Sequence, residues 1–463
     1  MPSAMVMQVR SNRPARFFKS FARGAMCWLL LWVAINTGPE SLDLNLIGTS
    51  LTSFFNGVRA AFPLVVLMLW LLHILSRRPR TIRSLTWPEA LWLYYGVVCL
   101  IAGSYADPWF KYSYWGFAYL SVFAAAEMYM HVMPTSQRAA NLNILSWIFC
   151  SGLIISIIWV TRGQLLAETS TGLSGYTISS RMPTVAGMPM VRPSGISRLA
   201  AVPAIVALPL IWETRGANRL IWIAVFVPSS YLVWVMQSRG SLSSLGLSLI
   251  VVMAMLKGTP RQATVGVLAT LWLIFMFGVI PGETVHHLWK FATRGMEGQE
   301  LASMSGRTRI FHEAWGAVKA APLMGYGPQA DRQMPNIDNA QNGVLYALLC
   351  GGFIGGSGYI GGLIVSWLMI FRVARHRRYL NPADRIMFVQ VAGIMAFFTI
   401  RSYPENCAAL FSIDLLVQLP AIIYIGELDR RLRAAFAARR VVHPSAVVAF
   451  SAPANKFAAA AHT

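Results

Sequence analysis

Acidic residues are scarce in this chain of 463 residues, which has 18 Asp and Glu but 39 Lys and Arg. Charged residues of both signs make up only 12% of the sequence, whereas hydrophobic residues make up 56%. Soluble domains carry about 25% charged residues. The low share of charge therefore excludes an ordinary soluble protein and predicts a chain embedded in a lipid bilayer.

Cysteine is also rare, and the cysteines that occur are far apart. All of them lie in or at the ends of apolar segments, without the spacing of a metal site or a disulfide framework. We interpret them as small hydrophobic residues. The adjacent His286 and His287 have no further ligand at a suitable spacing, so we expect neither a metal nor another cofactor. The cysteines are Cys27, Cys99, Cys150, Cys350 and Cys407.

Apolar segments long enough to cross a bilayer as helices recur from one end of the chain to the other. No stretch is left over for a soluble domain. The sequence predicts an all-α, polytopic integral membrane protein with about twelve transmembrane helices and one large external loop that contains short helices. The predicted spans are residues 21–37, 58–76, 88–106, 112–130, 142–160, 199–212, 219–236, 241–256, 264–281, 342–371, 385–402 and 408–426.

Most of the basic residues lie in alternate links between the predicted spans, on one side of the membrane. Because Lys and Arg are retained on the cytoplasmic side, this asymmetry predicts that both termini are cytoplasmic. A basic chain often binds nucleic acid, but here the charges follow the membrane sides. We therefore expect membrane lipids as partners and no nucleic acid.

Charge and hydropathy divide the chain into three parts. Residues 1–24 form a basic arm, residues 25–426 form the membrane domain, and residues 427–463 form a basic tail that starts as a surface helix and ends partly disordered. The first apolar segment has the length of a signal peptide, but no clear cleavage site follows it, so we interpret it as an uncleaved helix. The two predicted external loops are about residues 161–198 and 282–341.

The larger external loop contains a distinctive stretch from Ser305 to Asn342. A helix is predicted after the N-cap Ser305, because apolar residues recur at spacings of three and four. Arg307 falls within this apolar stripe and should face protein, while Arg309 and His312 fall on the opposite side. An arginine in the first turn opposes the helix dipole, so its position favours a bound anion such as phosphate. The alternative is that Arg307 pairs with a loop carboxylate or extends its charged end toward water.

Arg307 is one of five arginines at the predicted external face, where topology does not require positive charge. They come from four separate segments, and each segment adjoins a span. Such a group at one membrane face indicates a polyanion bound at the lipid surface. A lipid-linked pyrophosphate fits, because its head lies at that depth and its tail enters between helices. The five are Arg192, Arg198, Arg239, Arg307 and Arg401.

Several short motifs follow one another along the second half of the chain. They are Ser238-Arg239-Gly240, Ser305-Gly306-Arg307, Ala321 to Gly327, Ala340-Gln341-Asn342 and Gly351 to Gly355. This order resembles that of the O-antigen ligase and Wzy-type polysaccharide polymerase superfamily. The resemblance covers about residues 190–405, and the first five spans match only in kind. The span that contains the last motif carries glycines up to Gly362, with small-xxx-small spacings at 352/356 and 358/362. They indicate close helix packing, with a hinge as the alternative.

The resemblance implies an inverting, metal-independent glycosyltransferase of the bacterial inner membrane that works on its periplasmic side. The implied donor is an oligosaccharide linked to undecaprenyl diphosphate, and the implied acceptor is a hydroxyl of another glycan. By the same resemblance, Arg239 and Arg307 bind the pyrophosphate. Arg192 or Arg198 is then a further contact, and Arg401 lies in the same cavity.

One position departs from the family's pattern. The ligases usually have a histidine before the asparagine, proposed to activate the acceptor hydroxyl, and this chain has Gln341 there. Glutamine can orient a hydroxyl but cannot accept its proton. Asp338 is then the first candidate for the base, with Glu405 and His312 as alternatives. The departure favours a polymerase of exopolysaccharide or O-antigen units, with a chain-length regulator and export machinery as partners, over a ligase acting on lipid A-core.

Two functions of other classes fit part of the pattern. A transporter or flippase of lipid-linked sugars would share the basic pocket, but it would more often show two similar halves joined by a long cytoplasmic link. The corresponding link here, residues 213–219, is short. A non-catalytic assembly subunit is the third hypothesis, and the glutamine at position 341 is compatible with it.

Overall fold

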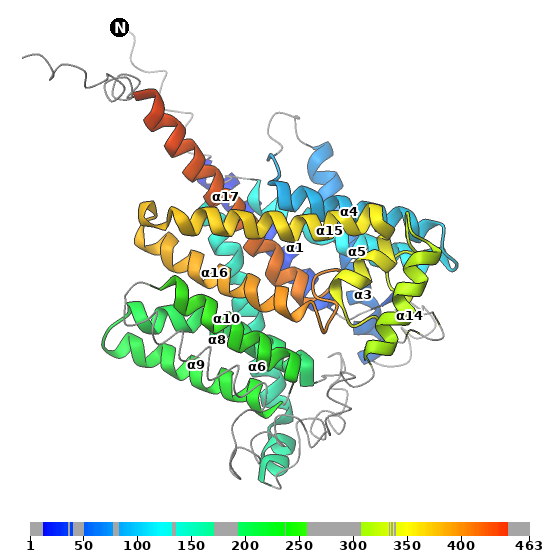
Figure 1. Ribbon diagram of the computed structural model, residues 1–463, viewed down its shortest axis with the longest axis horizontal. Helices are drawn as coiled ribbons and strands as arrows, with labels where there is room; N and C mark the ends of the chain where they lie inside the picture. The colour runs from blue at the N-terminus through cyan, green and yellow to red at the C-terminus, as the bar shows by residue number, and fades with distance from the viewer. Residues whose placement is uncertain are drawn as a thin grey trace, which may run out of the picture.

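The computed structural model describes residues 13–35, 38–39, 51–76, 83–131, 136–170, 193–236, 238–256, 307–332, 334, 337 and 339–442. Within these residues the chain forms helices and no β-strand, as the sequence predicts (Figure 1). The α-helices are α1 (Arg13–Ala34), α3 (Leu51–Leu75), α4 (Trp87–Ser104), α5 (Trp109–Met130), α6 (Ser136–Ser170), α8 (Pro193–Glu213), α9 (Ala217–Val235), α10 (Arg239–Met255), α14 (Arg307–Ala320), α15 (Gly343–Arg375), α16 (Pro382–Arg401) and α17 (Ile413–Val442). Two short 3₁₀ helices, η2 (Ala330–Arg332) and η3 (Arg377–Tyr379), lie beside α15.

Every predicted span that lies within the described residues overlaps one of these helices. In the part of the chain that the structure describes, six helical stretches are long and apolar enough to cross a membrane. The prediction of a helical, multi-pass membrane protein is therefore confirmed. The predicted span at residues 264–281 lies outside the described residues, so the count of twelve and the sides of the loops stay predictions.

The helices extend into both predicted external loops. α6 continues to Ser170 and α8 begins at Pro193, so helix takes up both ends of the loop predicted at residues 161–198. The larger loop, predicted at residues 282–341, is described from Arg307 onward and contains α14. Residues 171–192 and 257–306 lie outside the described residues.

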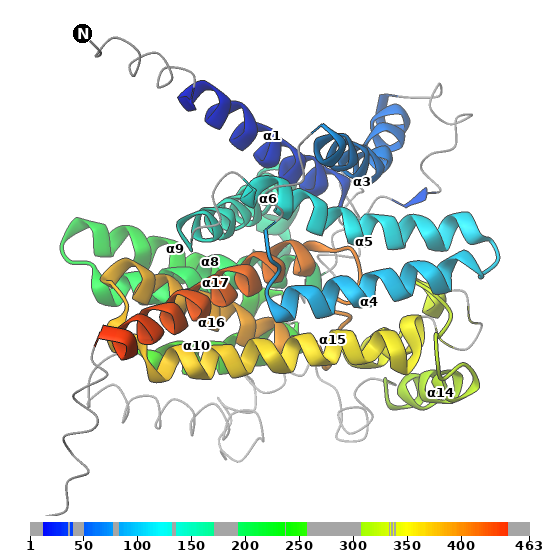
Figure 2. The same ribbon diagram turned by 90° about the horizontal axis from the view of Figure 1, so that it is seen from above.

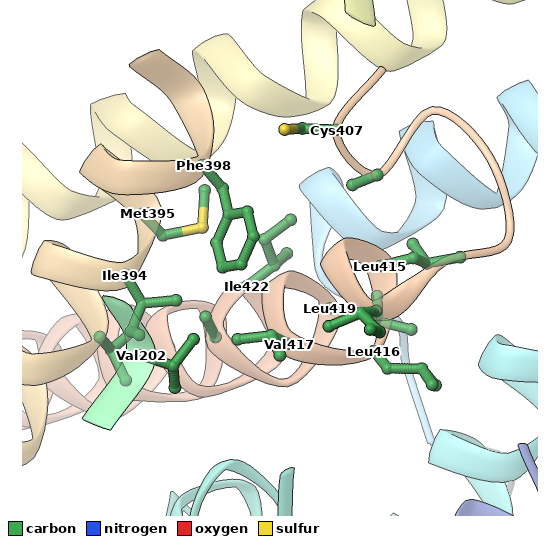
Figure 3. Packing of buried hydrophobic residues seen from close by; sticks show 14 of the residues in the cluster. Val202, Ile394, Met395, Phe398, Cys407, Leu415, Leu416, Val417, Leu419 and Ile422 are labelled. Atoms are coloured by element: carbon green, nitrogen blue, oxygen red, sulfur yellow. The ribbon is translucent and has the colours of Figure 1, made fainter. Parts of the chain in front are cut away.

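Two groups of helices pack on either side of α16 and α17. On one side α15 lies along α4, α4 pairs with α5, and α1 and α3 cover α5 (Figure 2). On the other side α8 and α10 pack against α16, and α9 lies against α8 (Figure 1). The hydrophobic core runs between the groups, where Val202 of α8, Ile394 of α16 and Val417 of α17 are fully buried (Figure 3). All five cysteines are buried and unbridged, which agrees with their interpretation as small hydrophobic residues.

The helix α15 is interrupted at Gly352, which has a φ of 60° and a ψ of −164°. Backbone groups released by the break pair with residues 322–327, which precede the helix in the chain. The Tyr326 N–H donates to the carbonyl of Leu349 at 2.9 Å. The Phe353 N–H donates to the carbonyl of Pro322 at 2.7 Å. The segment therefore completes the hydrogen bonding of a broken helix, which is necessary in an apolar environment.

Beyond the break, the glycines of α15 allow close contact with α4. A β-carbon added to Gly358 would lie 2.7 Å from the carbonyl oxygen of Leu91, and one added to Gly362 would lie 2.2 Å from the Trp92 ring. Real side chains cannot approach so closely, so these positions accept only glycine. The prediction of close helix packing is confirmed, and the break at Gly352 is an additional feature that the glycine pattern alone did not reveal.

Candidate functional site

The connection between α16 and α17, residues 402–412, contacts segments that are far apart in the sequence. We call it the α16–α17 turn. Pro404 lies against the start of α10, where a β-carbon on Gly240 would lie 3.0 Å from the proline ring. The ring of Tyr403 contacts that of Phe311 in α14, with 6.3 Å between centroids. Adjacent residues of one turn therefore position the helices that begin at the two predicted donor arginines.

The same turn holds the segment that leads into α15. The backbone N–H of Asn342 donates to Oδ1 of Asn406 at 2.9 Å, and Nδ2 of Asn406 donates to Oδ1 of Asn339 at 2.9 Å. The Asn342 side chain caps α15 by accepting from the Leu345 N–H, and its Nδ2 donates to the Tyr403 carbonyl. The Ala-Gln-Asn motif is thus fixed by hydrogen bonds on both sides of Gln341.

Arg307 and Gln341 meet at the N-terminus of α14. Nε of Arg307 donates to Oε1 of Gln341 at 2.5 Å, and both residues are partly buried. This bond engages one of the five N–H donors of the guanidinium group and fixes the plane of that group. The first turn of α14 adds backbone N–H groups and the positive end of the helix dipole. Together these groups form a geometry suited to an anion.

The backbone of Gln341 lies in the left-handed region, with a φ of 46°. Few residues other than glycine adopt this conformation. Two side chains hold it there, because the Gln341 N–H donates to Oδ1 of Asn339 at 3.2 Å and the Ala340 N–H donates to Oδ2 of Asp331 at 3.0 Å. Strained residues persist where their surroundings fix them, and they concentrate at functional sites.

Asp331 is a part of this site that the sequence did not reveal. It lies in η2 and is completely buried, at 0% exposure. Burial raises the pKa of its carboxyl group, while the hydrogen bond from Ala340 and the charge of Arg332 oppose that rise. A single aspartate in a polar loop has no characteristic spacing, so no sequence signal could have distinguished it.

The helix α14 presents the faces that its periodicity predicts. Ala314 and Val318 are fully buried, whereas Arg309 and His312 are exposed. Arg307 lies on the inner side, in contact with the loop before α15. The inward orientation predicted for Arg307 is confirmed, and its partner is an uncharged amide rather than a loop carboxylate.

Arg239 occupies the same position in α10 that Arg307 occupies in α14, the first residue of the helix. It is partly buried. Beside it, Oγ of Ser238 donates to Oγ of Ser241 at 3.1 Å, and Ser241 also accepts from Nε of Arg401 at 3.3 Å. The two helices begin at an arginine and pack against neighbouring residues of the α16–α17 turn.

Residues 223–360 match the family model described as O-antigen ligase. This segment is similar to O-antigen ligases, and we refer to it by that match as the O-antigen ligase domain. It contains Arg239, Arg307 and Gln341, whereas Arg198 and Arg401 lie outside it. The match confirms the resemblance to the O-antigen ligase and Wzy-type polymerase superfamily that the motifs suggested. Comparisons with curated proteins and with solved structures found no match.

The two arginines outside the O-antigen ligase domain share one carboxylate, that of Asp414 in α17. Nη1 of Arg198 lies 3.1 Å from both oxygens of Asp414, and Nη1 of Arg401 lies 3.5 Å from one of them. Arg401 is only 2% exposed, and it also donates to the carbonyl of Ser194 at 3.3 Å. Both arginines thus join α8, α16 and α17 through buried ion pairs, and substrate binding by either would compete with those pairs.

Of the predicted catalytic carboxylates, Glu405 lies within the described residues. Its Oε1 is 3.8 Å from Nη2 of Arg401, and 28% of its side chain is exposed, on the turn that contacts the O-antigen ligase domain. Asp338 and Arg192 lie outside the described residues. In the described part of the chain, no three His, Cys, Asp or Glu side chains gather closely enough to hold a metal ion.

Proposed function

We propose that this protein transfers an oligosaccharide from undecaprenyl diphosphate to a hydroxyl of an acceptor glycan, on the periplasmic side of the bacterial inner membrane. The acceptor oxygen bonds to the anomeric carbon of the donor sugar. The bond from that carbon to the phosphate oxygen breaks, and the lipid diphosphate leaves with the electron pair. The acceptor proton passes to a base. Attack on the side opposite the leaving group inverts the anomeric carbon. The O-antigen ligase match supports glycan transfer of this kind.

The observation that carries this proposal is Arg307 at the N-terminus of α14, oriented by Gln341. Its guanidinium group binds the pyrophosphate and neutralises the charge that develops as the bond to the sugar breaks. Each charge-assisted hydrogen bond contributes about 1.5–3 kcal/mol. Arg239 is the second donor contact, because its helix begins against the same turn, and Arg192 is a further one. Arginine charge then takes the place of a metal ion in activating the leaving group.

Gln341 acts by holding Arg307 in place. Its amide oxygen accepts the Arg307 Nε–H, and its left-handed backbone directs the side chain toward α14. A histidine at this position would serve as a base, whereas the amide fixes the guanidinium plane without adding or removing charge. The substitution of glutamine for histidine thus transfers the role of base to another residue.

We assign the base to Glu405, with Asp338 as the alternative. Glu405 is partly exposed on the turn that contacts both α10 and α14, so an acceptor that enters beside the turn meets a carboxylate. General-base catalysis contributes about 10²–10⁴-fold to the rate.

Among the activities of this superfamily we favour polymerisation of exopolysaccharide or O-antigen repeat units. A polymerase extends a lipid-linked glycan and works with a chain-length regulator and export machinery. Transfer to lipid A-core is the second candidate, and the description of the matched family as O-antigen ligase favours it. The two activities differ only in the acceptor, so the same donor site serves both.

The test is a reaction of the purified full-length protein in proteoliposomes with a lipid-diphosphate oligosaccharide, without a nucleotide sugar and with a chelator. Longer glycans on a gel support polymerisation, and transfer only after lipid A-core is added supports ligation. Arg307→Lys should reduce either product at least tenfold, because a point charge loses bidentate geometry. Arg309→Lys is the matched control, since that side chain is 80% exposed. Movement of the lipid across the bilayer without glycan transfer would indicate a transporter.

A further inference from the structure

A second basic site lies at the end of α15 that is remote from Arg307. α15 begins beside the candidate site at Gly343 and ends at Arg375, and its length and hydropathy suit a membrane span. Figures 1 and 2 place α14 at the first end of α15 and the last turns of α17 near the other. The two ends therefore lie at opposite faces of the membrane. Between the last turns of α15 and α17 there is a cleft of about 400 Å³.

Two arginines and one aspartate dominate this cleft. Nη1 of Arg372 lies 3.1 Å from Oδ2 of Asp429, and Nη2 of Arg433 lies 2.5 Å from the same oxygen. Asp429 is completely buried, whereas the side chains of Arg372 and Arg433 are 46% and 55% exposed. A single carboxylate cannot balance two guanidinium groups or engage their donors, five on each. The cleft therefore keeps positive charge and N–H donors that face outward.

A smaller cleft of about 320 Å³ lies on the other side of Arg433, against the start of α4. Arg430 and Trp87 line it, and Trp87 is 71% exposed. Arg433 thus stands between two open clefts, in which Asp429 is the sole acidic lining residue among those described. Exposed tryptophan and arginine at a helix end are typical of the headgroup region of a membrane.

A row of exposed apolar side chains leads from this cleft along α15 toward the middle of the membrane. Ile364, Leu368 and Phe371 are 55%, 55% and 59% exposed, and their spacing of four and three places them on one face. Arg372 follows directly at the headgroup end of this row. The positively charged Arg372 side chain and the apolar row are thus continuous on one helix.

We propose that this site binds an anionic phospholipid. The phosphate accepts hydrogen bonds from Arg372 and Arg433 in the 400 Å³ cleft, and an acyl chain lies along the apolar row of α15. A free phosphate would use the same arginines but would leave the apolar row uncovered, so the continuity of the two surfaces favours a lipid. This proposal does not depend on the proposed glycan transfer, because the site lies at the other membrane face.

The test measures ligand binding to the purified full-length protein in a neutral detergent. The probes are dioctanoyl phosphatidylglycerol, dioctanoyl phosphatidylcholine and inorganic phosphate, and bound lipid is counted by native mass spectrometry and titrated by thermophoresis. Two variants should change the affinity for phosphatidylglycerol in opposite directions. Arg433→Gln should weaken it about tenfold by removing charge-assisted hydrogen bonds. Asp429→Asn should tighten this affinity several-fold, because the carboxylate that competes for the arginines is gone. A misfolded protein could not produce such a gain in affinity.

Arg378→Gln is the matched control, since Arg378 is exposed at the same end of α15 but lies over the Tyr379 ring outside the cleft. The affinity of the Arg378→Gln protein for phosphatidylglycerol should equal that of the wild type. Equal binding of phosphatidylglycerol and inorganic phosphate would overturn the lipid assignment in favour of a free anion. Equal binding of phosphatidylglycerol and phosphatidylcholine, or no response to either cleft variant, would overturn the site itself.

Discussion

Arg401 and Asp414 form an ion pair that is almost completely removed from water, with 2% and 4% of their side chains exposed. The pair joins the end of α16 to the start of α17, on both sides of the turn that carries Tyr403 and Glu405. The geometry of the candidate site therefore rests on a charge pair between helices. Arg198 also pairs with Asp414, so removal of Arg401 leaves this carboxylate with one guanidinium partner instead of two.

We expect Arg401→Ala to reduce the free energy of unfolding by roughly 1–3 kcal/mol, because the Ser194 carbonyl and the buried Ser241 hydroxyl lose a donor while Asp414 keeps Arg198. The unfolding temperature of the protein in detergent measures this change. Arg309→Ala serves as the control, because Arg309 is 80% exposed and its pairing with Glu313 contributes little. An Arg401→Ala protein that melts like the wild type and loses only donor affinity would instead assign Arg401 to pyrophosphate binding.

The contact between Arg307 and Gln341 predicts the effect of a charge at position 341. Gln341→Glu places a carboxylate against the guanidinium group that should bind pyrophosphate, so the two anions compete. We expect the KM for the lipid-linked donor to rise about tenfold or more, with a smaller change in kcat. Gln341→Ala, which removes only the orienting bond, should reduce kcat/KM more modestly. Gln137→Glu, at an exposed position of α6, should change neither constant.

Glu405 should affect the rate of transfer and not the binding of the donor. With Glu405→Gln we expect kcat to fall by about 10²–10⁴-fold and the donor KM to stay nearly constant, because the base acts on the acceptor. Single-turnover assays of glycan transfer measure both quantities. Glu313→Gln, in the exterior helix α14, is the matched control. Full activity of Glu405→Gln would transfer the role of base to Asp338.

The sequence predicted those features that depend on local pattern. Apolar spans of sufficient length gave the helices, and the spacing of apolar residues gave the faces of α14, including the inward orientation of Arg307. The pairing of Arg401 with Asp414 could not be predicted, because a carboxylate within an apolar span shows no partner in the sequence. The break in α15 could not be predicted either, because glycine pairs serve close packing and helix interruption equally well.

The broken helix predicts a pair of glycine variants with opposite effects. In Gly352→Ala the new β-carbon would lie 2.1 Å from the Leu323 carbonyl oxygen, on a backbone that also has a positive φ. The strained backbone alone costs roughly 1–3 kcal/mol, and the clash adds to it. Gly316→Ala has no atom within 4 Å of the new carbon and should stabilise α14 by about 0.5–1 kcal/mol. Unfolding temperatures of the two proteins, compared with the wild type, test both expectations.

Asp331 predicts a pH dependence of stability. Burial raises the pKa of its carboxyl group above the unfolded value, so the folded protein holds this proton more tightly than the unfolded chain does. The resulting stabilisation is present below the unfolded pKa, about 3.9, and is lost as the pH rises through the raised pKa of the folded state. In Asp331→Asn the side chain has no charge to bury and still accepts from the Ala340 N–H.

We therefore expect the unfolding temperature of the wild type to fall relative to that of Asp331→Asn as the pH is raised from about 4 to neutrality. Thermal melts of both proteins in detergent, at closely spaced pH values, measure the difference. Asp107→Asn controls for general charge effects, because Asp107 is exposed. The difference in unfolding temperature between Asp107→Asn and the wild type should stay constant across the pH range. Melting curves of the wild type and Asp331→Asn that stay parallel across this range would show that the buried carboxyl group carries no proton linkage.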